Sequence, residues 1–233
     1  MAGRFLLKTG QTEMYHWDFY TVAQSFDLFL IGLRTTALYT IGSIMIGVVV
    51  GLLTAFARLS PWIVLRVLAR TYQEVFRCTP LLVQIMWAYY ALPLLIGVTI
   101  PNYIAGLIML SLYVGSFYAE IFRGGINAID KGQTEAGLAV GMSNAQAMRH
   151  IIMPQAIKKM LPAFINQSVI QVKNTSLLYA ISIAELTYMT YVVNGETYRP
   201  MEAYTLTAIL YFSMLFPLTQ FADYFERRMR RSD

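Results

Sequence analysis

Four stretches of the chain are long, apolar and free of charge, and they constrain its fold more than any other feature. They cover residues 38–57, 78–100, 101–119 and 203–222. A fifth stretch, 162–184, holds a single charged side chain, that of Lys173. A helix that crosses a bilayer needs roughly 20 predominantly apolar residues, and each stretch has about that length. We therefore expect an all-α, polytopic membrane protein.

Composition excludes an ordinary water-soluble domain. Only 13% of the 233 residues are charged and 57% are hydrophobic, whereas about 25% of a typical soluble domain is charged. The single cysteine, Cys78, excludes an internal disulfide. Residues 1–233 contain no internal repeat and no low-complexity tract, so we expect one transmembrane domain.

The basic residues predict how the chain crosses the membrane. If the N-terminus lies outside, 13 of the 18 lysines and arginines fall on the cytoplasmic side, as the positive-inside rule requires. This topology has five spans, at residues 28–57, 78–97, 101–122, 160–183 and 203–226, and a cytoplasmic C-terminus. The net charge of +5 is then a topology signal compatible with contact to anionic membrane lipid, and a nucleic-acid partner is not expected.

Segments outside the spans have their own patterns. Residues 1–27 are polar and aromatic, as in a helix on the outer membrane surface. Residues 60–77 begin with Ser60-Pro61, a helix-start pattern, and carry three arginines, which predicts an interfacial cytoplasmic helix. Residues 125–154 form a polar cytoplasmic loop between the third and fourth spans.

Small residues recur every four positions in two of the spans. They are Ser43, Gly47, Gly51 and Ala55 in the first span, and Ser111, Gly115 and Ala119 in the third. Such spacing lets two helix backbones approach closely within lipid. The alternative is that small residues are simply common in membrane helices.

The loop 125–154 has the pattern of two short capped helices. Asp130 can cap the first, with Gln133 able to reach back to the cap amide. Gly141 occupies a position suited to a left-handed helix end. A second capping-box pair and a terminal break follow, at Ser143, Gln146 and Pro154. The loop is thus expected to be a compact, rigid knob.

Within this loop, Glu135-Ala136-Gly137 is followed by Gly141 and then by Ile151-Ile152-Met153-Pro154. The arrangement resembles the "EAA" loop of the membrane-spanning subunits of ATP-binding-cassette (ABC) importers, E-A-A, three residues, G, nine residues, I-x-L-P. Every spacing matches. Gly137 replaces an alanine and Met153 a leucine, so that a small and an apolar side chain are kept.

Three further motifs resemble the polar amino acid branch of these importers, with histidine-, glutamine- and glutamate-type permeases. They are residues 77–84 (R-C-T-P-L-L-V-Q), 118–126 (Y-A-E-I-F-R-G-G-I, one residue shorter than the branch pattern) and 173–177 (K-N-T-S-L). All four motifs occur in the expected order within one topology.

The resemblance implies a type I ABC importer transmembrane fold in the bacterial cytoplasmic (inner) membrane. Two permease subunits, identical or homologous, would pair around a pathway, and an external amino-acid-binding protein would deliver the solute. ATP and magnesium would be used by a cytoplasmic ATPase dimer, so this chain itself would bind no cofactor. The implied ATPase-coupling residues are Glu135, Ala136, Gly137, Gly141, Ile151 and Pro154. The alternative for Glu135 is a solvated surface charge.

Polar residues in the fourth span are candidates for the solute pathway. Lys173 lies deep in the span, where an ionisable group usually faces water or a partner; it could also snorkel or pair with Glu185 or Glu120. Gln167, Gln171 and Asn174 share one helical face, although such residues also join membrane helices. Gln84 and Glu120 complete the candidate set.

The sequence has no phosphate-binding G-x-x-x-x-G-K-(S/T) loop, no H-E-x-x-H and no G-x-S-x-G. We therefore do not expect an enzyme, and expect ATP hydrolysis in a separate subunit. Three alternatives stay open. They are an ABC importer subunit for another small solute, a self-contained channel or ion-coupled carrier, and a membrane-embedded enzyme acting on lipid.

Overall fold

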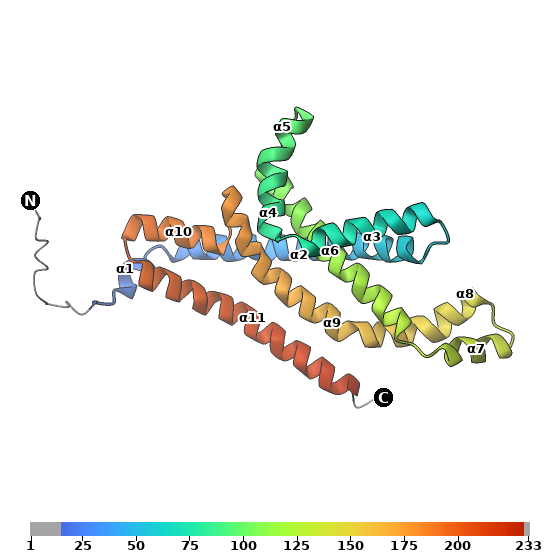
Figure 1. Ribbon diagram of the computed structural model, residues 1–233. Helices are drawn as coiled ribbons and strands as arrows, with labels where there is room; N and C mark the ends of the chain where they lie inside the picture. Colours follow the sequence, from blue (N-terminus) through green and yellow to red (C-terminus); the bar gives the residue numbers. More distant parts are fainter. Residues whose placement is uncertain (1–14, 231–233) are drawn as a thin grey trace, which may run out of the picture.

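The computed structural model describes residues 15–230, and all the regular structure in this part of the chain is helical. Figure 1 shows the long helices crossing one another, with the short helices α7 and α8 projecting at one end. The first half contains α1 (Phe19–Ala23), α2 (Phe26–Leu59), α3 (Ile63–Cys78), α4 (Leu81–Met86), the π-helical turn η1 (Trp87–Ala91), α5 (Leu92–Ile96) and α6 (Asn102–Asn127). The second half contains α7 (Lys131–Ala139), α8 (Asn144–Ala147), the π-helical turn η2 (Met148–Ile152), α9 (Met153–Asn174), the 3-10 helix η3 (Thr175–Ile181), α10 (Leu186–Thr197) and α11 (Pro200–Arg230).

The predicted all-α membrane fold is confirmed. Among the described residues, three helices are long and apolar enough to cross a membrane: Phe26–Leu59, Asn102–Asn127 and Pro200–Tyr224. Two bent pairs add up to two more spans, with bends of 109° after α3 and 49° before α10. The predicted number of five corresponds to the upper count, and the number of crossings stays a prediction.

Helices α2 and α6 run parallel and pack through their small residues. A Cβ atom built on Gly47 would lie 2.4 Å from Val114 Cγ1, and one built on Gly51 would lie 2.7 Å from Tyr118 Cβ. The contact partners on α6 advance as those on α2 advance, which defines the direction. The predicted close approach at the small residues is therefore confirmed, and the chain between α2 and α6 must return across the bundle.

Helices α9 and α11 run in opposite directions, and α9 is antiparallel to α6. Phe164 of α9 stacks on Tyr118 with 4.3 Å between ring centroids, while Gln171, further along α9, reaches back to Leu110. Thus α9 is antiparallel to α6. Thr219 lies beside α9, whereas the earlier α11 residues Thr207 and Tyr211 contact α10, so α11 is antiparallel to α9. The predicted topology requires this alternation; the side on which the N-terminus lies stays a prediction.

Two prolines follow π-helical turns instead of ending helices. Pro93 follows η1, and Pro154 follows η2 directly at the start of α9. A proline ring clashes with the carbonyl four residues earlier in an α-helix, and a wider π turn relieves that clash. The predicted break at Pro154 is therefore wrong, because helical structure continues from Asn144 to Ile181. The predicted fourth span, 160–183, lies inside this run as far as Ile181, and Pro162 is an interior residue of α9.

The segment before α11 contains a helix for which the sequence analysis gave no range. Helix α10 begins directly after its N-cap residue Glu185, whose carboxylate accepts hydrogen bonds from the amides of Thr187 and Tyr188. At the N-terminal end, the predicted outer helix within 1–27 is represented by the five-residue α1; residues 1–14 lie outside the described residues.

Candidate functional site

The helices α7 and α8 form the predicted knob, and its caps agree with the sequence pattern. The Asp130 carboxylate accepts a hydrogen bond from the Gly132 amide. Gly141 has a φ of 87°, a left-handed conformation that glycine adopts without steric cost. Ser143 and Gln146 form a reciprocal capping box. The predicted helix-glycine-helix arrangement is confirmed.

Close packing between the two halves makes the knob rigid. A Cβ atom on Gly137 would lie 2.9 Å from Ile151 Cδ1 and 3.2 Å from Ala147 Cβ, which accounts for glycine where the importer pattern has alanine. The Gln133 side chain does not reach back to Asp130; its carbonyl accepts a hydrogen bond of 3.2 Å from Gln155 on α9. That part of the capping prediction is wrong, and the contact joins the knob to the long helix.

The outer face of the knob is open to a partner. Glu135 and Ala136 are exposed, and Val140 is 76% exposed at the tip. Within the described part of the chain, Glu135 forms no ion pair. A rigid surface that combines a free carboxylate with an exposed apolar tip is suited to docking in a protein groove.

Lys173 is exposed near the C-terminal end of α9. Neither predicted carboxylate partner is paired with it, because Glu120 pairs with arginines and Glu185 caps α10. Among the described residues Lys173 forms no ion pair, so its ammonium group is open to the surface of this chain. Asn166 lies two helical turns earlier on the same exposed side and lines a cavity of about 330 Å³ between α9 and α11.

The three polar residues predicted to share a face of α9 are mostly engaged within the bundle. Gln167 and Gln171 are buried. The Gln171 amide donates hydrogen bonds to Ser43 on α2 and Leu110 on α6, and its carbonyl accepts one from Asn174. In this conformation Gln171 joins helices, which is the alternative noted for such residues.

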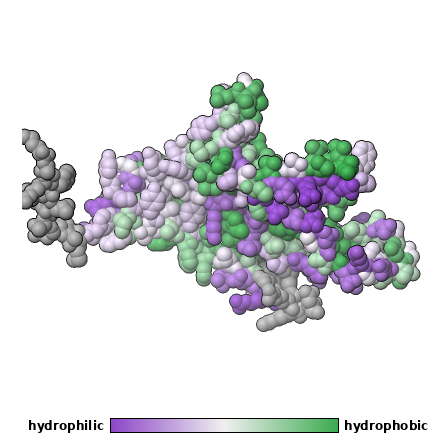
Figure 2. Space-filling view, viewed as in Figure 1, coloured by the Kyte–Doolittle hydropathy of each residue, from purple (hydrophilic) through white to green (hydrophobic). Residues whose placement is uncertain are grey.

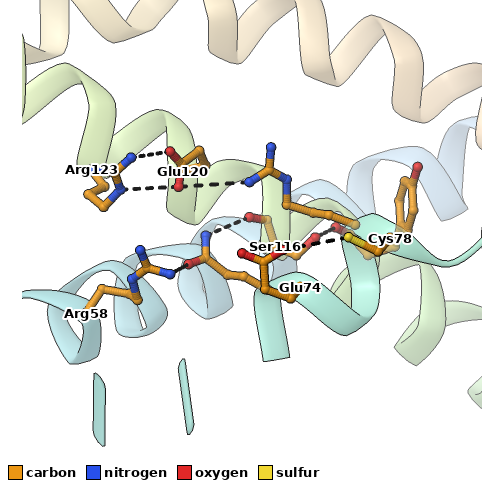
Figure 3. Close-up of polar contacts among 9 residues, drawn as sticks. Arg58, Glu74, Cys78, Ser116, Glu120 and Arg123 are labelled. Carbon is orange, nitrogen blue, oxygen red and sulfur yellow. Dashed lines mark hydrogen bonds and ion pairs between the residues drawn. The ribbon is translucent and has the colours of Figure 1, made fainter. Parts of the chain in front are cut away.

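Gln84 and Glu120 stabilise the corner at which α3 meets α4 and α6. The Gln84 amide donates hydrogen bonds to the carbonyls of Phe76 and Thr79 and so caps the end of α3. Glu120 accepts a hydrogen bond from Arg123, as the close-up in Figure 3 shows. Glu120 also lies 4.0 Å from the Arg77 guanidinium. These contacts give both residues structural partners in this chain.

One of two fully buried glutamates in the described part of the chain, Glu185, had been considered only as a partner for Lys173. Glu185 is fully buried, and the Tyr211 hydroxyl of α11 donates to it across 3.1 Å. A hydrogen bond of 3.2 Å from the Leu186 amide to the Thr36 hydroxyl ties the start of α10 to α2. The sequence does indicate that Glu185 has a buried partner, because an acidic residue directly after an apolar stretch requires one. Among the described residues, no group of acidic, histidine or cysteine side chains could hold a metal ion.

The fold and the knob together define a class of protein: a helical membrane protein with a compact pair of short helices between two long ones. Residues 47–231 match the family described as "Binding-protein-dependent transport system inner membrane component". The chain belongs to this family.

Curated relatives match almost end to end. An arginine transport system permease protein, ArtQ of Bacillus subtilis (strain 168), is 31% identical over 93% of this chain and 99% of its own length. The glutamine transport system permease protein GlnP of Escherichia coli (strain K12) is 34% identical over 92% of this chain and 98% of its own length.

Solved structures share the fold. A crystal structure of an amino acid ABC transporter with histidines has a TM-score of 0.87 and 37% identity, covering 92% of this chain and all of the other. The MetNI methionine ABC transporter in an inward-facing conformation has a TM-score of 0.72 and 19% identity, covering 88% of this chain and 98% of the other. This second likeness concerns the fold alone.

Proposed function

We propose that this chain is the translocation subunit of an ATP-driven importer of polar amino acids in the bacterial inner membrane. The observation that carries the proposal is the end-to-end likeness to an amino acid ABC transporter, at 37% identity and a TM-score of 0.87. The importer motifs at residues 77–84, 118–126 and 173–177 support the same solute class. An importer for another small solute is the second candidate, because relatives of one fold carry different solutes.

In this proposal the knob couples the chain to a cytoplasmic ATPase dimer. Glu135, Ala136 and the Gly141 turn face outward, while Gly137 and Ile151 hold the two halves together. Movement of the ATPase surface would be passed through the contact of Gln133 with Gln155 to α9. Because α9 packs on both α6 and α11, a tilt of α9 changes the arrangement of the whole bundle.

The pathway would lie on the exposed side of α9, next to a second permease subunit. Lys173 is exposed and Asn166 lines the cavity between α9 and α11, and an ammonium group can bind a solute carboxylate. Helix α11 has only 6% of its apolar window buried within the chain, which leaves a large face for a second subunit or lipid. An external binding protein would deliver solute at the end that carries α1 and the α10–α11 turn.

The proposal is tested by reconstituting the chain with its co-expressed ATPase and binding protein in proteoliposomes. Uptake of labelled glutamine, arginine, glutamate and histidine is measured with and without ATP inside. ATP-dependent uptake of one of these amino acids is expected. Uptake by the chain alone, without ATPase, would support the channel or carrier, and ATP-dependent uptake of an unrelated solute would support the second candidate.

The coupling role has a separate test. Glu135→Lys is expected to abolish uptake and to reduce co-purification of the ATPase, while insertion and expression stay at wild-type levels. Lys158→Glu, a charge reversal at another exposed position near the same end, is the matched control and is expected to retain uptake. Normal uptake by the Glu135 variant would remove the coupling role.

A further inference from the structure

Helix α3 is fixed to the bundle along one side only. Its buried residues are Ala69 and Gln73. The Gln73 carbonyl accepts a hydrogen bond of 3.0 Å from Arg58 of α2, and its amide donates one of 3.2 Å to the Ser116 carbonyl of α6 (Figure 3). These bonds set the rotation of α3 about its axis, so that the remaining sides of the helix face outward in a defined orientation.

One outward sector is apolar. Val64 is 64% exposed, Leu68 62% and Val75 50%, and their spacing of four and seven residues places them on one side of the helix. Figure 2 shows a hydrophobic patch on the side of α3 that faces away from the bundle. Single exposed apolar residues are ordinary, but a continuous apolar sector on one helix indicates contact with a lipid or protein surface.

The neighbouring sector is basic. Arg66 and Arg70 are exposed and one helical turn apart, so their guanidinium groups lie on one side. Figure 2 shows a hydrophilic band along this side of α3. Arg77, further along the helix, lies near Glu120, whereas neither Arg66 nor Arg70 has an acidic partner within the described residues.

The position of the helix identifies the partner. Three residues, Ser60 to Trp62, separate α2 from α3, so the start of α3 lies at the membrane-surface end of a candidate span. Lipid acyl chains can cover the apolar sector while anionic phosphates bind the adjacent guanidinium groups. Of the two surfaces that an apolar sector can contact, lipid is favoured over a soluble protein because α3 begins within three residues of a candidate membrane span.

We infer that α3 is a binding site for anionic phospholipid, with Arg66 and Arg70 as headgroup ligands. The inference rests on membership of a membrane family and not on the identity of the transported solute. Trp62 lies one turn before Arg66, since its carbonyl accepts the hydrogen bond of the Arg66 amide. The indole is therefore placed to report on lipid at the site.

The test uses the full-length chain with Trp17→Phe and Trp87→Phe, which leaves Trp62 as the single tryptophan of the three present. The protein is reconstituted into phosphatidylcholine vesicles that contain a fixed fraction of brominated phosphatidylglycerol or brominated phosphatidylcholine. Stronger quenching of Trp62 by the brominated phosphatidylglycerol is expected. In R66Q/R70Q the relative affinity for phosphatidylglycerol should fall by roughly tenfold.

Two controls distinguish specific binding from total charge. R66K/R70K should keep most of the preference for phosphatidylglycerol over phosphatidylcholine, because both positive charges stay in place. K131Q/K158Q removes the same charge from exposed positions outside α3 and should keep all of it. Equal quenching by both lipids in the wild type overturns the inference. An unchanged preference for phosphatidylglycerol in R66Q/R70Q also overturns it. If R66Q/R70Q in addition loses the co-purified ATPase, the two arginines belong to the ATPase contact. Uptake is not the readout, so an incorrect solute assignment would leave this result unaffected.

Discussion

Gln171 of α9 donates a hydrogen bond to the Ser43 hydroxyl of α2, with 3.0 Å between the two atoms. The same amide group donates to the Leu110 carbonyl of α6 at 3.1 Å, and the glutamine is fully buried. One side chain therefore joins three long helices at a site where water cannot replace a lost partner. The contact gives Gln171 the helix-joining role that was the alternative to a place in the solute pathway.

We expect Gln171→Leu to lower the stability of the chain by roughly 1 kcal/mol, the usual size of a hydrogen bond between membrane helices. The matched control is Asn166→Leu on the exposed side of α9, which should leave stability unchanged. Thermal unfolding in one detergent, followed by intrinsic fluorescence, measures both. An unchanged midpoint for the Gln171 variant would show that the bond to Ser43 contributes little.

A substitution at Lys173 should lower uptake without lowering the stability of the chain. It is exposed and has no ion pair among the described residues, so Lys173→Met should leave the unfolding midpoint unchanged. If the ammonium binds a solute carboxylate, uptake should fall by roughly tenfold or more, because hydrogen bonds to charged groups contribute about 1.5–3 kcal/mol. Lys173→Arg should recover part of the uptake. Wild-type uptake by Lys173→Met would exclude the lysine as a solute ligand.

The parallel packing of α2 on α6 predicts a strong difference between two glycines. A Cβ atom on Gly51 would lie 2.7 Å from Tyr118 Cβ and 3.1 Å from the Ala119 amide nitrogen, so the helices must separate. Gly51→Ala should cost about 1–3 kcal/mol. A Cβ atom on Gly42 meets only the end of the Leu107 side chain at 3.3 Å, and Gly42→Ala should be tolerated. Equal unfolding midpoints for the two variants would contradict this packing.

The sequence was sufficient for the helical membrane class because lipid imposes simple requirements on length and charge. It also predicted close helix packing at Gly47 and Gly51, since close packing between membrane helices depends on small residues, although it did not identify α6 as the partner. The left-handed conformation of Gly141 was predicted from its position at the end of a short helix. These features are determined by residues close together in the chain, or by the bilayer itself.

Features that depend on distant partners could not be derived in the same way. The position of Pro154 within continuous helix depends on the π turn before it, which no spacing indicated. The face shared by Gln167 and Gln171 was found correctly, but its burial depends on α2 and α6. Helix α10 is fixed by the hydrogen bond between Glu185 and Tyr211, residues of which only Glu185 had been noted.

The cap of α1 should respond to acid. The Thr21 hydroxyl and amide both donate hydrogen bonds to Asp18, and these bonds lower the pKa of the Asp18 carboxyl. A lowered pKa means that the cap stabilises α1 above the ordinary aspartate pKa of about 3.9. The stabilisation is then lost as pH falls through the folded pKa. Hydrogen exchange of residues 15–23 should accelerate, relative to α6, below about pH 4, and Asp18→Ala should remove this dependence.

Gly141 tests whether the shape of the knob matters for coupling. No neighbouring atom lies within 4 Å of a Cβ atom built at this position, yet its φ is 87°. Alanine would therefore fit in space but would be strained by about 1–2 kcal/mol in the left-handed conformation. We expect Gly141→Ala to reduce solute-stimulated ATPase activity and uptake together, while the chain stays folded in the membrane. Gly124→Ala is the matched control, because Gly124 is equally uncrowded but lies in ordinary α6 helix. If both variants retain wild-type coupling, the left-handed corner is not required to transmit movement from the ATPase.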